Sequence, residues 1–184
     1  MTDLPNIPHR VEDAHSPMTE TVPARLAVAL TGISAAAFVD QITKWLILEV
    51  VMQPPRVIPI VPFFNLTLGY NTGVSFGLLK GMFTESPWAL AALNLAIMAG
   101  LLFWASRARS GRESLALGLI SGGALGNVID RLRQGAVTDF FDFYIGSWHW
   151  PTFNMADVAI VVGAFVLVGG DMFSRRGPVA SVTT

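Results

Sequence analysis

The sequence predicts an all-α membrane bundle of four transmembrane helices that carries a small β-sheet on one side. The composition is the first reason: 52% of the 184 residues are hydrophobic and only 14% are charged, whereas a soluble domain has about 25% charged residues. The second reason is that four stretches approach the roughly 20 apolar residues that a bilayer-spanning helix needs. The third is a short segment in which apolar and polar residues alternate, as in a strand.

The apolar stretches define one membrane-embedded domain at residues 25–174. Polar tails flank it at residues 1–24 and 175–184, and we expect the first tail, with its four prolines, to be disordered. Ser86 and Pro87 suit the start of the second helix, because serine caps helices and proline fits the first turn. The predicted helices occupy residues 26–51, 87–105, 113–129 and 155–173.

The distribution of arginine predicts how the bundle is oriented. Positive charge in short loops favours the cytoplasmic side of a membrane. Both termini are therefore predicted to be cytoplasmic, and the connector after the first helix and the one before the fourth helix are predicted to face outward. The arginines on the predicted inner side are Arg25, Arg107, Arg109, Arg112, Arg175 and Arg176.

The connector between the first two helices predicts a strand at residues 64–71, where the residues alternate between large apolar and small or polar types. Backbone that is not helical cannot face lipid hydrocarbon. We therefore expect a small sheet that lies on the outer membrane surface. The alternating apolar residues are Phe64, Leu66, Leu68 and Tyr70.

Several function classes are disfavoured by what the sequence lacks. It has no cysteine, which excludes disulfides, thiol nucleophiles and cysteine-bound metals. The net charge of −1 indicates no nucleic-acid partner. A metal site built from His149 and aspartates has no supporting motif. Ser75, Ser121 and Ser147 lack a histidine or lysine at a spacing typical of an activated serine nucleophile. We expect neither a metal nor a cofactor.

Asp40 and Lys44 stand four residues apart, and therefore on one face of the first helix. An ionisable residue near the centre of a membrane helix costs roughly 2.5–3.5 kcal/mol. Two interpretations remain open: a structural ion pair that fixes helix packing, or a polar support beneath an active site.

The third helix carries Gly118, Gly122 and Gly126, which repeat every four residues. Small residues at this spacing let helices approach closely. We therefore expect tight packing, which would hold Asn127 and Asp130 in place at the end of that helix.

The segment before the fourth helix concentrates acidic and amide groups. Asn154 suits the N-cap of that helix and Asp157 its third position, where a carboxylate is favoured by the helix terminus. Asp139 has apolar neighbours, which favour its neutral form. Two such carboxylates fit an acid–base pair that acts on one water. Asp40, Asp130 and Asp157 also fit a proton relay in a small transporter, and a non-catalytic scaffold is a further alternative.

The motifs together resemble the lipoprotein signal peptidase, or signal peptidase II, family. Val74 and Ser75 depart from the two alanines that are usual there. The matching pieces stand in family order: Asp40-Gln-Ile-Thr-Lys44, Asn71-Thr-Gly73-Val-Ser-Phe76, Gly122-Gly-Ala-Leu-Gly126-Asn127-Val-Ile-Asp130-Arg131, Val137-Thr-Asp139-Phe140 and Phe153-Asn154-Met-Ala156-Asp157.

The resemblance implies an aspartic endopeptidase of the bacterial inner membrane that cuts prolipoproteins before a diacylglyceryl-modified cysteine. It implies that Asp139 and Asp157 are the catalytic pair, with Asp130 as the rival to Asp139. It also implies a monomer in contact with membrane lipid, inhibition by globomycin-type compounds, and a short extracytoplasmic helix near residues 140–150. The residues expected to bind substrate or support the site are Asp40, Lys44, Asn71, Gly73, Asn127, Asp130, Arg131, Asn154 and Ala156.

Overall fold

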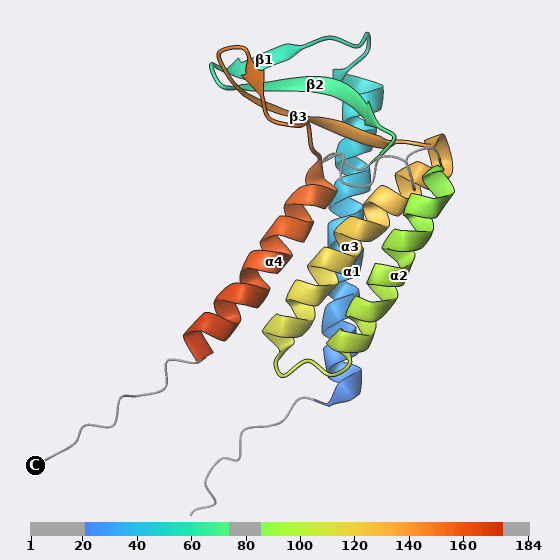
Figure 1. Ribbon diagram of the computed structural model, residues 1–184, viewed down its shortest axis with the longest axis vertical. Helices are drawn as coiled ribbons and strands as arrows, with labels where there is room; N and C mark the ends of the chain where they lie inside the picture. The colour runs from blue at the N-terminus through green and yellow to red at the C-terminus, as the bar shows by residue number, and fades with distance from the viewer. Residues whose placement is uncertain (1–20, 74–85, 175–184) are drawn as a thin grey trace, which may run out of the picture.

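The computed structural model describes residues 21–73 and 86–174, which form a helical bundle with a sheet at one end (Figure 1). The two predicted tails lie outside the described residues, apart from residues 21–24. Val74 and Ser75 also lie outside them. The helices are α1 (Val22–Leu46), which continues into a π-helix (Ile47–Val51), α2 (Pro87–Ala105), α3 (Gly111–Gln134) and α4 (Met155–Ser174). The strands are β1 (Ile58–Val61), β2 (Phe64–Asn71), β3 (Val137–Ile145) and β4 (Trp148–His149).

Three of these helical stretches are long and apolar enough to cross a membrane: Val22–Val51, Trp88–Ala105 and Gly111–Gln134. In α4 the stretch Met155–Gly170 is also apolar. Large apolar side chains on the outside of the bundle are widely exposed, for example Phe38 at 69% and Phe165 at 74%. Apolar surface of this extent indicates contact with lipid rather than water.

The helix α3 lies between the other helices and packs closely against α1 and α4. A Cβ atom added at Gly122 would lie 2.6 Å from the backbone oxygen of Ile33 in α1. On another face of α3, an added Cβ at Gly123 would clash with the backbone oxygen of Ala156 in α4. The predicted close packing of α3 is therefore confirmed, and it brings the start of α4 against the last turns of α3.

The sheet is antiparallel, with the strand order β1-β2-β3-β4. The predicted strand at residues 64–71 is confirmed as β2, which pairs with β3 so that Asn65 lies opposite Asp142 and Gly69 opposite Asp139. Figure 1 shows the sheet across the end of the bundle where α2 and α4 begin. This arrangement brings β3, which carries Asp139, to the end of the bundle where α4 begins (Figure 1).

The expectation of a short helix near residues 140–150 is wrong, because these residues form β3 and β4. The backbone of Phe141 is bonded to Phe153 on one side, and its Cα pairs with Leu66 in β2 on the other. The rings of Phe141 and Phe143 lie 5.8 and 4.8 Å from the ring of Phe64. Cross-strand aromatic pairs of this kind stabilise a sheet, so tertiary pairing decides the conformation here.

Two helices are longer than the sequence predicted. Helix α1 begins at Val22, with a proline in its first turn, and α3 continues to Gln134 before Gly135 ends it at φ 79°. Asp130 and Arg131 consequently lie within α3 rather than beyond it. Because consecutive helical residues are about 100° apart around the axis, these two neighbours face different surroundings.

Candidate active site

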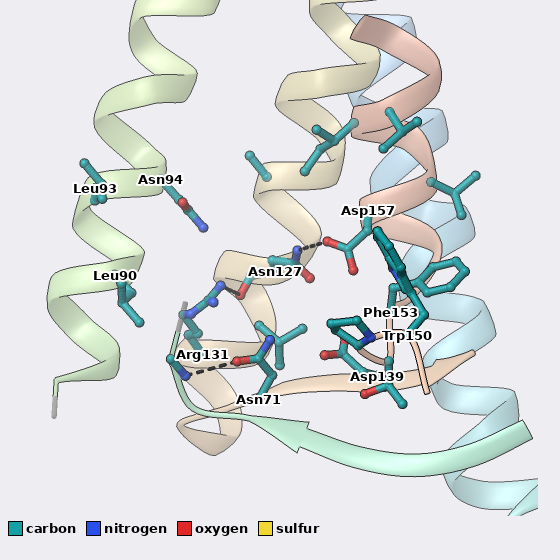
Figure 2. A pocket seen from close by; sticks show the side chains of 18 of the residues that line it. Asn71, Leu90, Leu93, Asn94, Asn127, Arg131, Asp139, Trp150, Phe153 and Asp157 are labelled. Carbon is teal, nitrogen blue, oxygen red and sulfur yellow. Dashed lines mark hydrogen bonds between the residues drawn. The ribbon is translucent and has the colours of Figure 1, made fainter. Parts of the chain in front are cut away.

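A cavity of about 720 Å³ lies between α2, α3, α4 and the sheet (Figure 2). Its helical walls are largely apolar, with residues such as Leu90, Val158 and Val161. Polar side chains gather at the end near the sheet, and Figure 2 shows them around one space. They are Asn71, Asn127, Arg131, Asp139 and Asp157.

Asp139 projects into this cavity from β3 and is only 2% exposed. The side-chain amide of Asn154 donates a hydrogen bond of 2.6 Å to its Oδ1. Burial, and next the negative charge of Asp157, raise the pKa of Asp139 to about 6. The hydrogen bonds from Asn154 and Asn71 and the charge of Lys44 oppose that shift. Asp139 therefore retains a proton at a pH where an ordinary aspartate has lost it.

Asp157 lies in the first turn of α4, where its carboxylate is bound by donors on both oxygens. Its Oδ2 accepts from the backbone N–H of Asn154 at 3.1 Å, while its own N–H donates to Oδ1 of Asn154 at 3.1 Å. The side chain of Asn127 donates to its Oδ1 at 3.2 Å. The predicted capping arrangement is thereby confirmed, as a reciprocal pair of bonds at the start of the helix.

Asn154 links the two aspartates and is completely buried. Its oxygen accepts from Asp157, while its amide nitrogen donates to Asp139 and also lies within 3.3 Å of Asn127 Oδ1 and 3.2 Å of the Thr138 carbonyl. One carboxamide therefore fixes both carboxylates relative to each other. The capping pattern predicts the contact with Asp157, but nothing in the sequence predicts the contact with Asp139.

Behind the cavity lies a separate charged cluster made by Asp40, Lys44 and Asp130. The Lys44 ammonium is 2.8 Å from Asp40 Oδ2 and 2.9 Å from Asp130 Oδ2, and all three side chains are buried. The predicted ion pair between Asp40 and Lys44 is confirmed, and the structure adds Asp130 to it. None of the three side chains lines the cavity.

The charged cluster also holds the backbone that carries the two cavity aspartates. Asp40 Oδ1 accepts from the N–H of Ala156 at 2.9 Å, in the first turn of α4. Asp130 Oδ2 accepts from the N–H of Thr138 at 3.0 Å, next to Asp139 on β3. The residues preceding Asp157 and Asp139 are therefore each bonded to a buried carboxylate.

The sequence of this chain is similar to those of known signal peptidases. The family model described as Signal peptidase (SPase) II matches residues 33–173. The chain belongs to this family. A lipoprotein signal peptidase of Burkholderia mallei is 45% identical over 148 residues, or 79% of this chain and 89% of that protein. One from Hydrogenovibrio crunogenus is 42% identical over 146 residues, or 77% of this chain and 84% of that one.

Solved structures show the same fold. A bacterial membrane enzyme aligns with a TM-score of 0.68 at 24% identity, over 86% of this chain and 95% of that one. This member of the signal peptidase II family therefore has the helical bundle and small sheet of a known membrane enzyme, which agrees with its apolar helices.

The structure divides the predicted site residues of this signal peptidase II chain into two groups. Those that line the cavity are Asn71, Gly73, Asn127, Arg131, Asp139 and Asp157. Those that lie behind it are Asp40, Lys44, Asp130, Asn154 and Ala156. Asp130 and Asp139, the two candidates for the catalytic partner of Asp157, thus belong to different groups: Asp139 lines the cavity and Asp130 lies behind it.

Sequence analysis missed two polar residues near the site. Gln41 follows Asp40 on α1, and its amide donates to Asp40 Oδ2 at 3.1 Å and to Asp130 Oδ1 at 3.0 Å. Asn94 lines the cavity from α2. Asn94 could have been identified from the sequence as a polar residue within an apolar helix, since such residues in membrane segments generally have a function.

His149 takes part in a different contact, on the sheet. Its Nδ1 lies 2.8 Å from Asp142 Oδ1, and Asn65 donates to the other oxygen of that carboxylate at 3.1 Å. Neither His149 nor Asp142 lines the cavity. Within residues 21–73 and 86–174 no group of three or more histidines and acids is arranged to hold a metal ion.

Proposed function

We propose that this peptidase removes signal peptides from prolipoproteins by cutting before a diacylglyceryl-modified cysteine, with Asp139 and Asp157 as its catalytic pair. Membership of the signal peptidase II family supports the reaction and the substrate class. The observation that carries the assignment of residues is the shared cavity, in which two aspartates meet in unlike surroundings, one in the first turn of a helix and one buried with a raised pKa.

The chemistry needs one carboxylate and one carboxylic acid. Asp157 takes a proton from water as the water oxygen bonds to the scissile carbonyl carbon. Asp139 polarises the carbonyl and gives its proton to the leaving nitrogen as the C–N bond breaks. A proton then passes from Asp157 to Asp139, which restores the starting state. Because the two carboxylates interact, their titration belongs to the pair rather than to either residue.

Asn154 has a positioning role in this mechanism. It accepts from Asp157 and donates to Asp139, so it keeps the two carboxylates at a fixed separation. Two further amides bind the aspartates: Asn127 donates to Asp157, and Asn71 forms a hydrogen bond with Asp139. Asp40, Lys44 and Asp130 support the pair through the backbone of Ala156 and Thr138.

The direct test is cleavage of a synthetic diacylglyceryl-cysteine prolipoprotein peptide by purified protein in detergent. Asp139→Asn and Asp157→Asn are each expected to lose turnover by more than about 10³-fold, as when a member of a catalytic unit is removed. Asp142→Asn is the matched control, since Asp142 lies on the same strand outside the cavity. A folded Asp139→Asn variant with normal turnover, beside an inactive Asp130→Asn variant, would move the partner of Asp157 to α3.

A proton-coupled transporter, the alternative from residue types alone, is not favoured. Two of the three carboxylates in the supposed relay, Asp40 and Asp130, share the buried ammonium of Lys44. A relay acid must pass protons along a chain of acids, whereas these two are both paired with one buried ammonium.

The proposed placement is a monomer in the bacterial inner membrane, with four spanning helices, cytoplasmic termini and the cavity at the outer face. The arginine-rich loop between α2 and α3 supports it, as do Trp148 and Trp150, both exposed at the sheet end. Globomycin-type inhibitors are expected to compete for the cavity.

The absence of cysteine in the sequence allows a direct test of this placement. Single cysteines at Ser147, on the β3–β4 turn, and at Ser110, before α3, would be treated with a membrane-impermeant maleimide in spheroplasts. Label at Ser147→Cys alone is expected. Label at Ser110→Cys alone would reverse the orientation.

A further inference from the structure

The helix α2 contains one strongly hydrophilic side chain, Asn94, in the middle of the sequence Ala-Ala-Leu-Asn-Leu-Ala-Ile. Leu90 lies one turn before it on the same face, and both residues line the cavity. Figure 2 shows the Asn94 side chain pointing from α2 into this space, on the side of the cavity away from the sheet. Leu95 and Ile97, which do not line the cavity, are 41% and 50% exposed on the lipid-facing side of the helix.

Among the residues that the structure describes, Asn94 has no hydrogen-bond partner. Asn94 is only partly buried, so its carboxamide is open to the cavity and can bind a group there. The other amides that line the cavity, Asn71 and Asn127, are engaged with the catalytic aspartates. Asn94 is thus a polar group that faces the substrate space and that the proposed chemistry does not use.

A substrate segment in this cavity has unpaired groups of its own. The carbonyl that the water attacks has to be accessible, so the peptide next to the cut is extended rather than helical. A signal peptide is apolar before its cleavage site, and its extended backbone along apolar walls leaves N–H and C=O groups without partners. A carboxamide offers a donor and an acceptor in one plane, which matches one peptide unit. The ester of a lipid chain offers only an acceptor.

We propose that Asn94 is a substrate-binding residue, whose carboxamide binds the N–H and C=O of one peptide unit in the extended end of the signal peptide. This inference rests on the proposed function, since it assumes a prolipoprotein in the cavity. It adds a substrate contact on the helix opposite the catalytic pair. The contact recognises backbone rather than side chain, so it favours an extended conformation before the cut over any particular residue.

The first test compares kcat/KM for the diacylglyceryl-cysteine peptide in wild type, Asn94→Leu, Asn94→Gln and the control Leu95→Ala. Asn94→Leu is expected to lower kcat/KM roughly 5- to 100-fold, the size expected when buried hydrogen-bonding groups lose their partner. Asn94→Gln, which keeps the carboxamide, is expected to recover part of that loss. Leu95→Ala is expected to leave kcat/KM unchanged.

Thermal unfolding separates this effect from damage to the fold. Replacing an unpartnered amide by leucine in an apolar helix is expected to preserve or raise the unfolding temperature. Unchanged kcat/KM in a folded Asn94→Leu variant would overturn the inference while leaving the proposed function intact. Failure of folded wild type to cleave the peptide would instead overturn the proposed function.

The second test identifies the bound group. Peptides in which one backbone amide before the cut is replaced by an ester lack a single N–H. Wild type is expected to cleave one of these peptides more slowly, and Asn94→Leu is expected to show no further loss on that peptide, since the two changes remove one interaction. If the ester replacement and Asn94→Leu lower kcat/KM independently at every peptide position, Asn94 does not bind the peptide backbone. Coupling found only with ether-linked lipid chains, which lack the ester carbonyl, would assign Asn94 to the lipid instead.

Discussion

Two groups of buried aspartates lie close together in this protein, and they differ in what compensates their charge. In the cluster behind the cavity, Asp40 and Asp130 share the ammonium of Lys44 at 2.8 and 2.9 Å. In the cavity, Asp139 and Asp157 are bound by the amides of Asn127 and Asn154. Among the described residues, neither cavity aspartate forms an ion pair within 4.0 Å.

Under the proposed function, this difference separates the aspartates that support the site from those that carry out the chemistry. A carboxylate paired with a cation can hold its neighbours in place, as Asp40 and Asp130 do for the backbone of Ala156 and Thr138. In the described part of the chain, Asp139 and Asp157 have Arg131 in the same cavity but no cation within 4.0 Å. Two such carboxylates repel each other, which favours a proton on one of them. Asp139 is that residue, with its pKa raised to about 6. A water in the cavity would thus meet both a base and an acid.

The largest effect is expected from removing the cation of the charged cluster. Lys44→Met leaves two buried carboxylates without compensation, which typically costs about 3–5 kcal/mol of unfolding free energy. Unfolding of the purified variant in detergent measures this loss. The control is the triple variant Lys44→Met with Asp40→Asn and Asp130→Asn, which removes the charges together and is expected to recover much of the loss. A stable single variant would show that the cluster does not depend on Lys44.

Neutralising one aspartate in each group is expected to shift stability in opposite directions. Asp139 has a folded-state pKa above its ordinary value of 3.8. Its penalty is therefore absent below about pH 4 and grows as the pH rises through about 6. Asp139→Asn removes the penalty and is expected to raise the unfolding free energy at pH 7 by up to about 3 kcal/mol, at about 1.4 kcal/mol per pKa unit. Asp130→Asn is expected to lower the unfolding free energy. Thermal unfolding of both variants and of wild type at pH 4 and pH 7 measures these changes in stability. A lower stability of Asp139→Asn than of wild type at pH 7 would contradict the expected difference between the two groups.

The smallest effect concerns the pH dependence of cleavage. If Asp139 acts as the acid, kcat/KM of wild type is expected to decline above about pH 6, as that carboxyl loses its proton in the free enzyme. The hydrogen bond from Asn71 lowers the pKa of Asp139, so Asn71→Ala is expected to move the decline to higher pH. A profile that stays flat between pH 5 and 8, or a decline that moves to lower pH in the variant, would assign the acid role elsewhere.

Local patterns in the sequence were sufficient for the elements and for several contacts within them. The alternation at residues 64–71 predicts β2, and Asn154 with Asp157 predicts the capping bonds at the start of α4. The spacing of Gly118, Gly122 and Gly126 predicts the close approach of α1 and α3. These features depend on neighbours at most a few residues apart, or on one repeated helix face, so they can be recognised without a fold.

The candidate residues were also identifiable from the sequence, chiefly because their motifs resemble those of a known family, but their division into two groups was not. Asp130 and Asp139 are nine positions apart, yet one meets Lys44 from α1 and the other meets Asn154 before α4. Those partners lie far away in the chain or on a different element. Residues 140–150 form strands rather than a helix because β2 and Phe153 supply their hydrogen bonds.

The sequence by itself therefore determined the class of the protein, its apolar helices and the set of candidate polar residues, which lie in the motifs that resemble the family. Only the tertiary structure decided which aspartates face the cavity and which are paired with Lys44 behind it. The physical reason is that the charge state of a buried carboxylate depends on the groups within a few ångströms of it. In this protein those groups come from five elements, α1, α3, β2, β3 and α4, and from the segment leading into α4.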